Sequence, residues 1–395
     1  MLKVIRKFLR PLKIRVINIR AGVKQKYHSL MFSQLYKYAR PINNSYGTML
    51  FWVPGGMSSL LHVEGAIATA LRLRGIKVHA VICDGIFKAC ARRTINETAP
   101  LENWSQTCKN CIKESRDVLD IMKIPYSFIG DFVSEAETRE FRQIIDTCNL
   151  YDFSYNNINV GTHVRSSVIR YLQGESINSI DKVIAKEYAF AGLVVASSAL
   201  SVMEKISPFG VFMSHGTYVD WGIALHIAVS RGIPVTAWHS SYLDGRLYFR
   251  SVEETRNISL HVISPGTWEV YKKNVLTQQE NELMDNFIND RYQKNVRKDK
   301  IYITFNNYSG DTAYLRKKYQ LENDKPLWGI MAHLNWDSVA DYSPMAYANF
   351  DDWILDTLRE IINISSVNWI IKIHPVEAYF SPDSGIEQLI KKHFP

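Results

Sequence analysis

The stretch Met49-Leu50-Phe51-Trp52-Val53-Pro54-Gly55-Gly56 decides the fold. It begins with an apolar run that has the length and composition of a buried strand, and its proline and glycines predict a sharp turn. A helical pattern then runs from about Ser59 to Arg74, Gly75 ends it, and Lys77 to Cys83 forms a second apolar strand. This order of strand, glycine turn, helix and strand predicts the opening of a Rossmann-like α/β domain.

The glycine turn is itself a candidate binding element. Gly55 and Gly56 permit close backbone approach at the start of the helix, where amide groups can receive an anion or a hydroxyl-rich acceptor. These glycines lack the spacing of the dinucleotide-binding fingerprint, so the sequence does not predict NAD binding.

A second unit of the same kind lies further along the chain. Gly210 to Met213 predicts a strand, about Asp220 to Arg231 predicts a helix, and Arg231-Gly232-Ile233 repeats the earlier Arg74-Gly75-Ile76 before another strand. The recurrence predicts two βαβ elements in one doubly wound domain. It places His215 at the carboxyl end of a strand as the leading candidate for a general base, with a histidine that merely hydrogen-bonds its own loop as the alternative.

The C-terminal part shows one more βαβ pattern. Its strands cover Pro326 to Leu334 and Asn368 to His374, with a helix from about Asp351 to Ser365 between them. Since ligands of open α/β sheets bind outside the carboxyl ends of the strands, a site is expected where the polar groups follow them. These groups are Asn335, Asp337, His374 and Glu377.

These patterns divide the 395-residue chain into four parts. They are a basic N-terminal arm over 1–46, a Rossmann-like domain over 47–267, a polar connector over 268–325 and a partial second Rossmann-like domain over 326–395. We expect the last domain to be incomplete, because two strands are fewer than a Rossmann-like domain needs.

Charge separates the arm from the rest of the chain. Residues 1–40 carry 11 of the 47 Lys and Arg residues and no acidic residue, so the remainder has 36 basic and 39 acidic side chains. A nucleic-acid enzyme would carry a basic footprint on its folded body, so the balance argues against nucleic acid as a partner. The arm has an amphipathic pattern typical of contact with an anionic membrane surface, and a solvated terminus is an equally good interpretation.

Targeting signals are weak in this sequence. The basic N-terminus never gives way to the apolar core of a signal peptide, and we find no run of eighteen apolar residues. We therefore expect a cytoplasmic protein with reduced thiols, peripheral on the inner membrane face if the arm binds there.

Four of the five cysteines form a pattern that suggests metal binding. Their spacing is Cys83-x6-Cys90-x17-Cys108-x2-Cys111, and the second pair has the spacing of a zinc knuckle. Structural zinc, free thiols and a redox pair all remain open, with free thiols favoured. No cofactor is required for chemistry in any of these interpretations.

Two polar residues precede a predicted helix in the middle of the chain. His163 and Arg165 lie in Gly161-Thr162-His163-Val164-Arg165, where they could meet an anionic ligand at the helix entry. For each residue taken alone, a surface role is the more common case.

The motifs Cys83-Asp84-Gly85 with Cys90, and Lys372-Ile373-His374-Pro375-Val376-Glu377, resemble those of a known family. Over about residues 47 to 380, the chain resembles bacterial capsular-polysaccharide and related surface-glycan glycosyltransferases of the GT-B fold, which has two Rossmann-like domains facing each other across a cleft. In that family, a further helix with a carboxylate follows the histidine-proline motif and completes the nucleotide pocket. The resemblance therefore implies that this sequence lacks part of that pocket.

The resemblance implies a metal-independent transfer of sugar from a nucleotide-activated donor to a lipid-linked or free surface glycan. The histidine-proline motif is similar to that of sialyl-, Kdo- and glycerophosphate-type transferases, where it lies against the donor's phosphate; His374 would take this role with Lys372, and Glu377 would hold the ribose. His215, or alternatively Asp220 or Glu64, would accept the proton of the acceptor hydroxyl, while Asn335 and Asp337 line the site. A sugar-nucleotide epimerase or hydrolase and a non-enzymatic glycan-assembly binding protein are the rival classes.

Overall fold

The computed structural model describes twelve stretches of the chain. They are residues 25–43, 46–55, 58–95, 101–173, 182–241, 245–252, 263, 265–292, 312–337, 346–347, 349–377 and 384–394. The chain forms two compact units, of which the first comprises Met1–Val164, Lys182–His239 and Phe249–Ile258, and the second comprises Arg165–Asp181, Ser240–Tyr248 and Ser259–Pro395.

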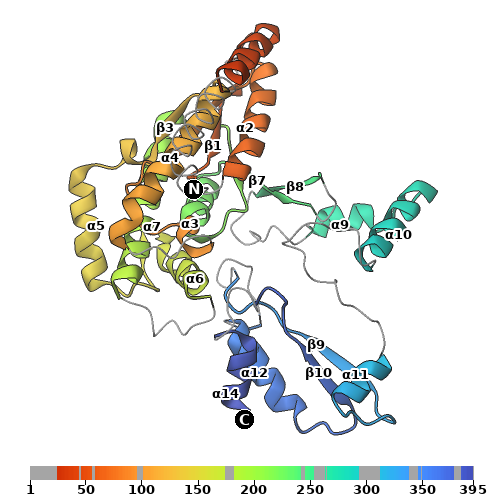
Figure 1. Ribbon diagram of the computed structural model, residues 1–395. Coiled ribbons are helices and arrows are strands. Elements are labelled where there is room, and N and C mark those ends of the chain that lie inside the picture. Colours follow the sequence, from red (N-terminus) through yellow and green to blue (C-terminus); the bar gives the residue numbers. More distant parts are fainter. Residues whose placement is uncertain are drawn as a thin grey trace, which may run out of the picture. The chain divides into compact units, whose positions relative to one another are not determined.

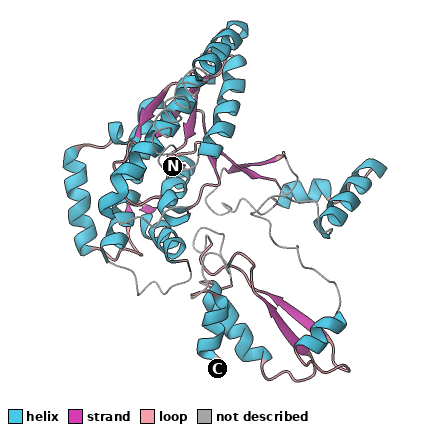
Figure 2. Ribbon diagram, viewed as in Figure 1, coloured by secondary structure: helices cyan, strands magenta, loops and turns pink. Residues whose placement is uncertain are grey.

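A six-stranded sheet is the centre of the first unit (Figures 1 and 2). Its spatial order is β3-β2-β1-β6-β7-β8, and the pairs β1/β2, β2/β3, β1/β6 and β6/β7 are parallel. Numbered along the chain, this is the order 3-2-1-4-5-6 of doubly wound sheets. The strands are β1 Thr48–Trp52, β2 Lys77–Ile82, β3 Tyr126–Phe128, β6 Gly210–Ser214, β7 Val235–Ser240 and β8 Leu247–Val252.

Helices and one short hairpin complete the first unit. Residues 25–35 are helical, and a two-residue hairpin joins β4 Ser154–Tyr155 to β5 Ile158–Asn159. The turns are η1 Tyr36–Tyr38, η3 Leu101–Asn103, η4 Ile129–Phe132 and the π-helical η6 Tyr218–Gly222. The helices are α2 Ser58–Leu73, α3 Ala91–Ile95, α4 Trp104–Ile121, α5 Glu135–Thr147, α6 Val160–Leu172, α7 Lys182–Ile206 and α8 Ile223–Ser230.

The repeated Arg-Gly-Ile motif ends two helices in the same way. After α2 the amide of Gly75 donates to the Arg72 carbonyl and that of Ile76 to the Leu71 carbonyl. After α8 the amides of Gly232 and Ile233 make the equivalent bonds three and five residues back. Both glycines are left-handed, with φ of 82° and 72°, so each helix stops where the next strand must begin.

Packing on the sheet buries a continuous apolar core. α2 and α4 pack on each other, and their side chains join those of β1 and β2 in one cluster that includes Phe51, Ile82 and Leu119. α7 packs against α5 and α8. α7 is long and apolar enough to cross a membrane, but 72% of its most apolar window is buried, which is what a core helix shows.

The second unit contains a smaller α/β layer. Its two-stranded parallel sheet pairs β9 Leu327–Met331 with β10 Asn368–Lys372, and its helices include α12 Phe350–Ile361 and α14 Ile386–His393 beside it (Figure 1). Ile354 of α12 and Ile386 of α14 are fully buried in one cluster with the strands. The remaining helices are α9 Pro265–Tyr271, α10 Gln278–Tyr292 and α11 Thr312–Lys318.

The α/β class predicted from the sequence is confirmed, and the expected strands β1, β2, β6, β7, β9 and β10 all form. The sequence analysis missed the short strand β3, the strand β8 and the helix α4. Most of the basic arm and part of the connector lie outside the described residues.

Candidate functional site

The candidate site of the first unit lies where the strand order reverses. The chain builds β1, β2 and β3 outward in one direction and β6 and β7 in the other, so the switch point lies between β1 and β6. Ligands of doubly wound sheets bind outside the carboxyl ends of the strands at this point. Gly55 follows β1 here, and His215 follows β6.

The loop after β6 has an unusual backbone. Gly216 and Tyr218 are both left-handed, with φ of 70° and 62°, and Tyr218 opens the π-helical turn η6. A positive φ at a tyrosine is uncommon and costs about 1 kcal/mol or more, and π-helical turns are frequent at functional sites. The surrounding fold therefore holds this loop in a conformation that its sequence alone disfavours.

His215 has a defined tautomer in this loop. Its Nδ1 accepts a hydrogen bond of 3.3 Å from the backbone amide of Thr217 and lies 2.9 Å from the Thr217 hydroxyl. Because a backbone amide only donates, the neutral imidazole carries its proton on Nε2. The ring also meets Trp221 edge-on, with centroids 4.5 Å apart. In this tautomer His215 is a hydrogen-bond donor through Nε2, which suits the expected role of base poorly.

Glu64 is a buried acid on α2. Its side chain is 3% exposed, and its Oε1 accepts a hydrogen bond of 3.1 Å from the indole Nε1 of Trp238 in β7. Burial raises the pKa of Glu64 from 4.5 to about 8, against the opposing effect of hydrogen bonds from Trp238 and the Ser214 backbone. Glu64 is therefore mostly protonated at neutral pH.

Asp220 is a second buried acid, inside η6. It is 2% exposed, and its Oδ2 accepts a hydrogen bond of 2.6 Å from the amide of Ala91. Within the described residues, its Oδ1 is buried and has no hydrogen-bond partner. Burial raises the pKa of Asp220 from 3.8 to about 7, with the Ala91 amide acting in the opposite direction. Asp220 thus exchanges a proton near neutral pH and has one oxygen that is not engaged by its surroundings.

The four patterned cysteines come together around one small cavity beside Asp220. The cavity measures about 30 Å³, enough for roughly one or two water molecules, and Gly55, Asp220 and Trp104 share its lining with the four thiols. The cysteines are Cys83, Cys90, Cys108 and Cys111. Cys108 and Cys111 lie three residues apart on α4, so both side chains lie on the helix face that meets the cavity.

Three thiols of this cluster, those of Cys83, Cys90 and Cys108, are protonated at neutral pH. Burial raises the pKa of Cys83, Cys90 and Cys108, and the neighbouring thiols add to the rise. Among the residues that the structure describes, no group of three or more His, Cys, Asp or Glu side chains is arranged to hold a metal ion. A metal at this site would have to draw the thiols together and displace their protons.

The glycine after β1 is required by its surroundings. Gly55 has φ of 102°, and a Cβ added there would lie 3.2 Å from Ser115 Oγ and 3.4 Å from Cys111 Sγ of α4. Gly56, the other predicted acceptor-binding glycine, lies outside the described residues.

The two polar residues predicted at a helix entry lie inside α6. His163 is 3% exposed, meets His226 edge-on at 4.9 Å and lies so close to Gly222 that a Cβ there would be 2.6 Å from its ring. It therefore packs against η6 and α8 and supports the strained loop. Arg165 is half-buried on the same helix and belongs to the second unit.

In the second unit, the predicted donor-binding histidine follows β10. His374 Nδ1 accepts a hydrogen bond of 3.2 Å from the amide of Val376, so its neutral ring carries the proton on Nε2. Burial lowers the pKa of His374, and His333 after the adjacent strand β9 lowers it further. Lys372, at the end of β10, is exposed. His374 is therefore placed as a neutral hydrogen-bond donor at a strand end.

Glu377 has a structural contact that the sequence analysis did not foresee. Its Oε1 accepts a hydrogen bond of 3.1 Å from the amide of Glu387 and another from that of Ile386, at the start of α14. Burial raises its pKa, and a Cβ at Gly385 would lie 2.1 Å from its carboxyl carbon. The carboxylate that the resemblance assigns to a ribose caps a helix here.

The two residues after β9 are also engaged. Asn335 donates from Nδ2 to Asp351 Oδ1 at 2.9 Å, near the start of α12. Asp337 accepts from Arg170 at 2.5 Å. Both contacts lie within the second unit.

Sequence reasoning missed the partners that place the two buried acids. The Trp238 indole donates a hydrogen bond to the Glu64 carboxyl. The Trp52 indole donates to the backbone carbonyl of Asp220 at 2.8 Å, and the Ala91 amide donates to the side-chain carboxylate of Asp220. The available signal was the position of both tryptophans near strand ends, where a buried indole needs an acceptor.

The fold and site define an α/β protein with two buried acids of near-neutral pKa at the switch point of its main sheet. No protein-family model and no curated protein matches the chain. One similar solved structure is a CDPS from Fluoribacter dumoffii, with 14% sequence identity, a TM-score of 0.31 and coverage of 53% of this chain and 92% of that chain. We draw no conclusion about fold or function from so low a TM-score.

Proposed function

We propose that the protein is a GT-B-type glycosyltransferase that moves a sugar from a nucleotide-activated donor to a surface-polysaccharide acceptor. The first unit handles the acceptor hydroxyl and the second unit the donor phosphate. The proposed donor and acceptor classes come from the motif resemblance around Cys83-Asp84-Gly85 and His374-Pro375. The proposed proton transfer is supported by the buried carboxyl groups of the first unit.

The buried Asp220 carboxyl is the observation that carries the proposal. A general base works best when its pKa lies near the operating pH, and the pKa of Asp220 is about 7. Its unpartnered Oδ1 is the atom that takes the acceptor's proton, through a water molecule in the small cavity beside it, since Oδ2 is held by Ala91. Asp220 therefore replaces His215 as first candidate for the base, because His215 Nδ1 is already an acceptor in its loop.

The proposed reaction uses one proton transfer and one displacement. Asp220 takes the proton of the acceptor hydroxyl while the acceptor oxygen forms a bond to the anomeric carbon of the donor sugar. The bond between that carbon and the phosphate oxygen of the nucleotide breaks at the same time. His374 donates a hydrogen bond from Nε2 to the leaving phosphate, where negative charge develops. Glu64, mostly protonated at pH 7, and His215 act as further hydrogen-bond donors beside the acceptor.

A donor and acceptor screen on the full chain tests the proposal. CMP, UDP, GDP and CDP are first ranked by thermal stabilisation, since a ligand that binds the folded state raises Tm. The matching nucleotide sugars are then incubated with and without a lipid-linked glycan, and we expect acceptor-dependent sugar transfer. Acceptor-independent conversion would instead indicate an epimerase or hydrolase, and no nucleotide binding would indicate a binding protein.

We propose separately that a structural zinc ion binds at the thiol cluster beside Asp220, which requires the thiols to move closer together and lose their protons. Four cysteines line one cavity, and thiolates are the ligands that structural zinc prefers. Such an ion would fix α4 against the strand ends and play no part in the transfer step. Metal analysis of chain purified without chelator should give about one zinc per chain, and a Cys108→Ser variant should lose it.

We also propose that the N-terminal segment contacts an anionic membrane surface. In the helix over 25–35, Tyr27, Leu30, Met31 and Leu35 recur at helical spacing and are each at least 40% exposed. Lys and Arg residues surround this apolar face in the sequence, where 1–40 carries no acidic residue. An exposed apolar face flanked by cations is the composition of a peripheral membrane helix.

A further inference from the structure

A large pocket opens at the opposite end of the main sheet from the candidate site. Its lining includes Thr48 at the start of β1, Lys77 at the start of β2 and Pro125 just before β3. Since these three strands are parallel, this is the amino-terminal edge of the sheet, whereas the candidate site lies at the carboxyl edge. The pocket volume is about 690 Å³, which is within the range of small-molecule sites.

The pocket carries an uncompensated positive charge. Arg40, Arg72, Lys77 and Lys205 line it, and among the described residues that do so none is acidic. Within the described part of the chain, none of these four cations has an ion-pair partner. A concave surface lined by charges of one sign concentrates the field, so this pocket attracts anions.

Two of the cations are held in place by aromatic rings. The Arg72 guanidinium lies 4.1 Å over the Tyr36 ring and donates to the Lys123 carbonyl. The Tyr36 hydroxyl is fixed in turn by a hydrogen bond of 2.9 Å to the Met122 carbonyl. The Lys205 ammonium lies 5.5 Å from the Phe132 ring. These contacts orient the cations without neutralising them.

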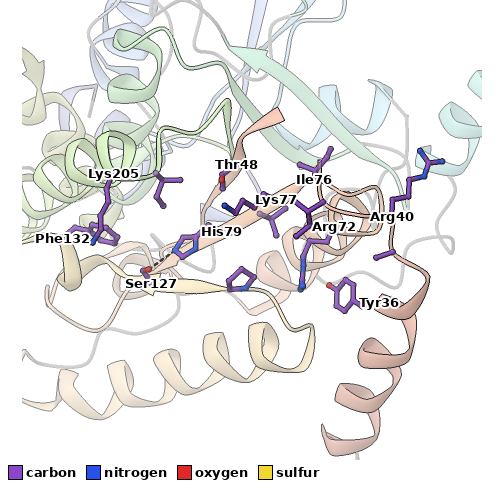
Figure 3. A pocket seen from close by; sticks show the side chains of 15 residues that line it. Tyr36, Arg40, Thr48, Arg72, Ile76, Lys77, His79, Ser127, Phe132 and Lys205 are labelled. Atoms are coloured by element: carbon purple, nitrogen blue, oxygen red, sulfur yellow. Dashed lines mark hydrogen bonds between the residues drawn. The ribbon is translucent and has the colours of Figure 1, made fainter. Parts of the chain in front are cut away.

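The floor of the pocket provides neutral polar groups. His79 Nε2 and Ser127 Oγ lie 2.9 Å apart and join β2 to β3, as the dashed line in Figure 3 shows. In that view the pair lies between Lys205 on one side and Arg72 with Tyr36 on the other. Burial lowers the pKa of His79, so its ring is a neutral hydrogen-bonding group at pH 7.

Apolar side chains complete the lining. They are Ile42, Ile76, Val78, Pro125, Phe132 and Ile206. A simple inorganic anion would leave this surface unused, whereas an organic group attached to a phosphate would cover it. Phosphate oxygens accept hydrogen bonds from Arg and Lys side chains, and from hydroxyl and imidazole groups, all of which line this pocket.

We propose that this pocket binds a phosphate ester, a second ligand site at the sheet edge remote from the candidate active site. The shared chemistry is a phosphate mono- or diester bearing an organic group. Its source is either a soluble phosphorylated metabolite or the headgroup of an anionic phospholipid. The proposal does not depend on the transfer reaction.

Binding to the full chain tests the site with matched charge variants. The pocket variant carries Lys77→Gln and Lys205→Gln, and the control carries Lys109→Gln and Lys113→Gln, which remove the same charge from the exposed face of α4. All side chains replaced are exposed, so both variants are expected to fold, with melting curves as a check. The soluble probes are glycerol 3-phosphate and UMP in isothermal titration, and the membrane probe is a phosphatidylglycerol/phosphatidylcholine vesicle in co-sedimentation.

We expect at least one probe class to bind the wild-type and control chains, with at least tenfold weaker binding to the pocket variant. Loss with the soluble probes identifies a phosphorylated metabolite, and loss with vesicles alone identifies a lipid headgroup. Equal weakening in both variants would mean diffuse charge attraction and would overturn the proposal. Two other results would also overturn it. One is that no soluble probe binds and the pocket variant binds vesicles as well as wild type does; the other is that no probe binds at all.

Discussion

The indole Nε1 of Trp238 donates a hydrogen bond of 3.1 Å to Oε1 of Glu64, joining β7 to α2 across 174 residues of sequence. This bond is made at the carboxyl end of the main sheet, and both partners are buried. It fixes a carboxyl group that the protein interior keeps protonated at neutral pH, because ionising it would place an unpaired charge in a low-dielectric environment.

Glu64 should make stability fall as the pH rises. Its pKa is 4.5 in the unfolded chain and about 8 in the folded chain, so between these values the folded state holds one more proton and loses free energy of unfolding with increasing pH. Glu64→Gln removes this loss of free energy of unfolding, which is on the order of 3 kcal/mol between the unfolded and folded pKa values of Glu64. Melting curves at pH 5 and pH 8 should show a smaller drop in Tm for Glu64→Gln than for wild type. Glu135→Gln, on the exposed face of α5, is the control and should retain the wild-type drop.

The two glycines of the repeated motif should differ in their tolerance of alanine. Both need a left-handed backbone, which costs about 1–2 kcal/mol for alanine. At Gly75 the new Cβ would also lie 2.3 Å from the Pro41 carbonyl oxygen, whereas at Gly232 it meets nothing within 4 Å. Gly75→Ala should therefore lower Tm clearly more than Gly232→Ala. Equal shifts would show that the close approach of residues 40–43 to the end of α2 does not hold the first unit together.

Membrane contact should depend on the apolar face of the N-terminal helix. Leu30→Glu with Leu35→Glu removes apolar area and adds negative charge, so co-sedimentation with anionic vesicles should fall at least fivefold. Val275→Glu with Ile362→Glu makes the same chemical change at other exposed apolar positions and should leave vesicle binding unchanged. A similar loss in both variants would assign the binding to net charge.

His374 offers a test of donor binding with two near-isosteric changes. Asn keeps an acceptor for the Val376 amide but lacks the Nε2 proton, whereas Gln places an amide donor near Nε2. We expect His374→Asn to lower kcat by about 100-fold and His374→Gln by less, because the lost hydrogen bond strengthens as the phosphate leaves. His393→Asn, at the exposed end of α14, is the control. Unchanged kcat in His374→Asn would remove His374 from the reaction.

The sequence predicted the elements that local patterns specify. The Met49–Val53 run, the glycine after it and both Arg-Gly-Ile motifs gave the first βαβ elements, since strand length, turn chemistry and helix ends are properties of short stretches. β3 was missed because its three residues, Tyr126–Phe128, have no pattern of their own and form a strand by pairing with β2.

The chemistry of the site depended on tertiary contacts that no short stretch reveals. Asp220 was a secondary candidate because its pKa rises only when the fold buries the carboxyl, and burial is a tertiary property. His215 was favoured for its strand-end position, which is correct, but its tautomer is set by Thr217. The family resemblance assigned Glu377 to a ribose, while the position of α14 decides what its carboxylate contacts.

The pH dependence of sugar transfer by wild type and Asp220→Asn tests the central claim most directly. With the pKa of Asp220 near 7, the wild-type rate at saturating donor should rise with pH through about 7, as the carboxylate becomes available as base. Asp220→Asn keeps an oxygen for the Ala91 amide but should lose at least about 100-fold in kcat together with that rise. Asp324→Asn, an exposed change, should match wild type. A fully active Asp220→Asn with the wild-type pH profile would contradict the account.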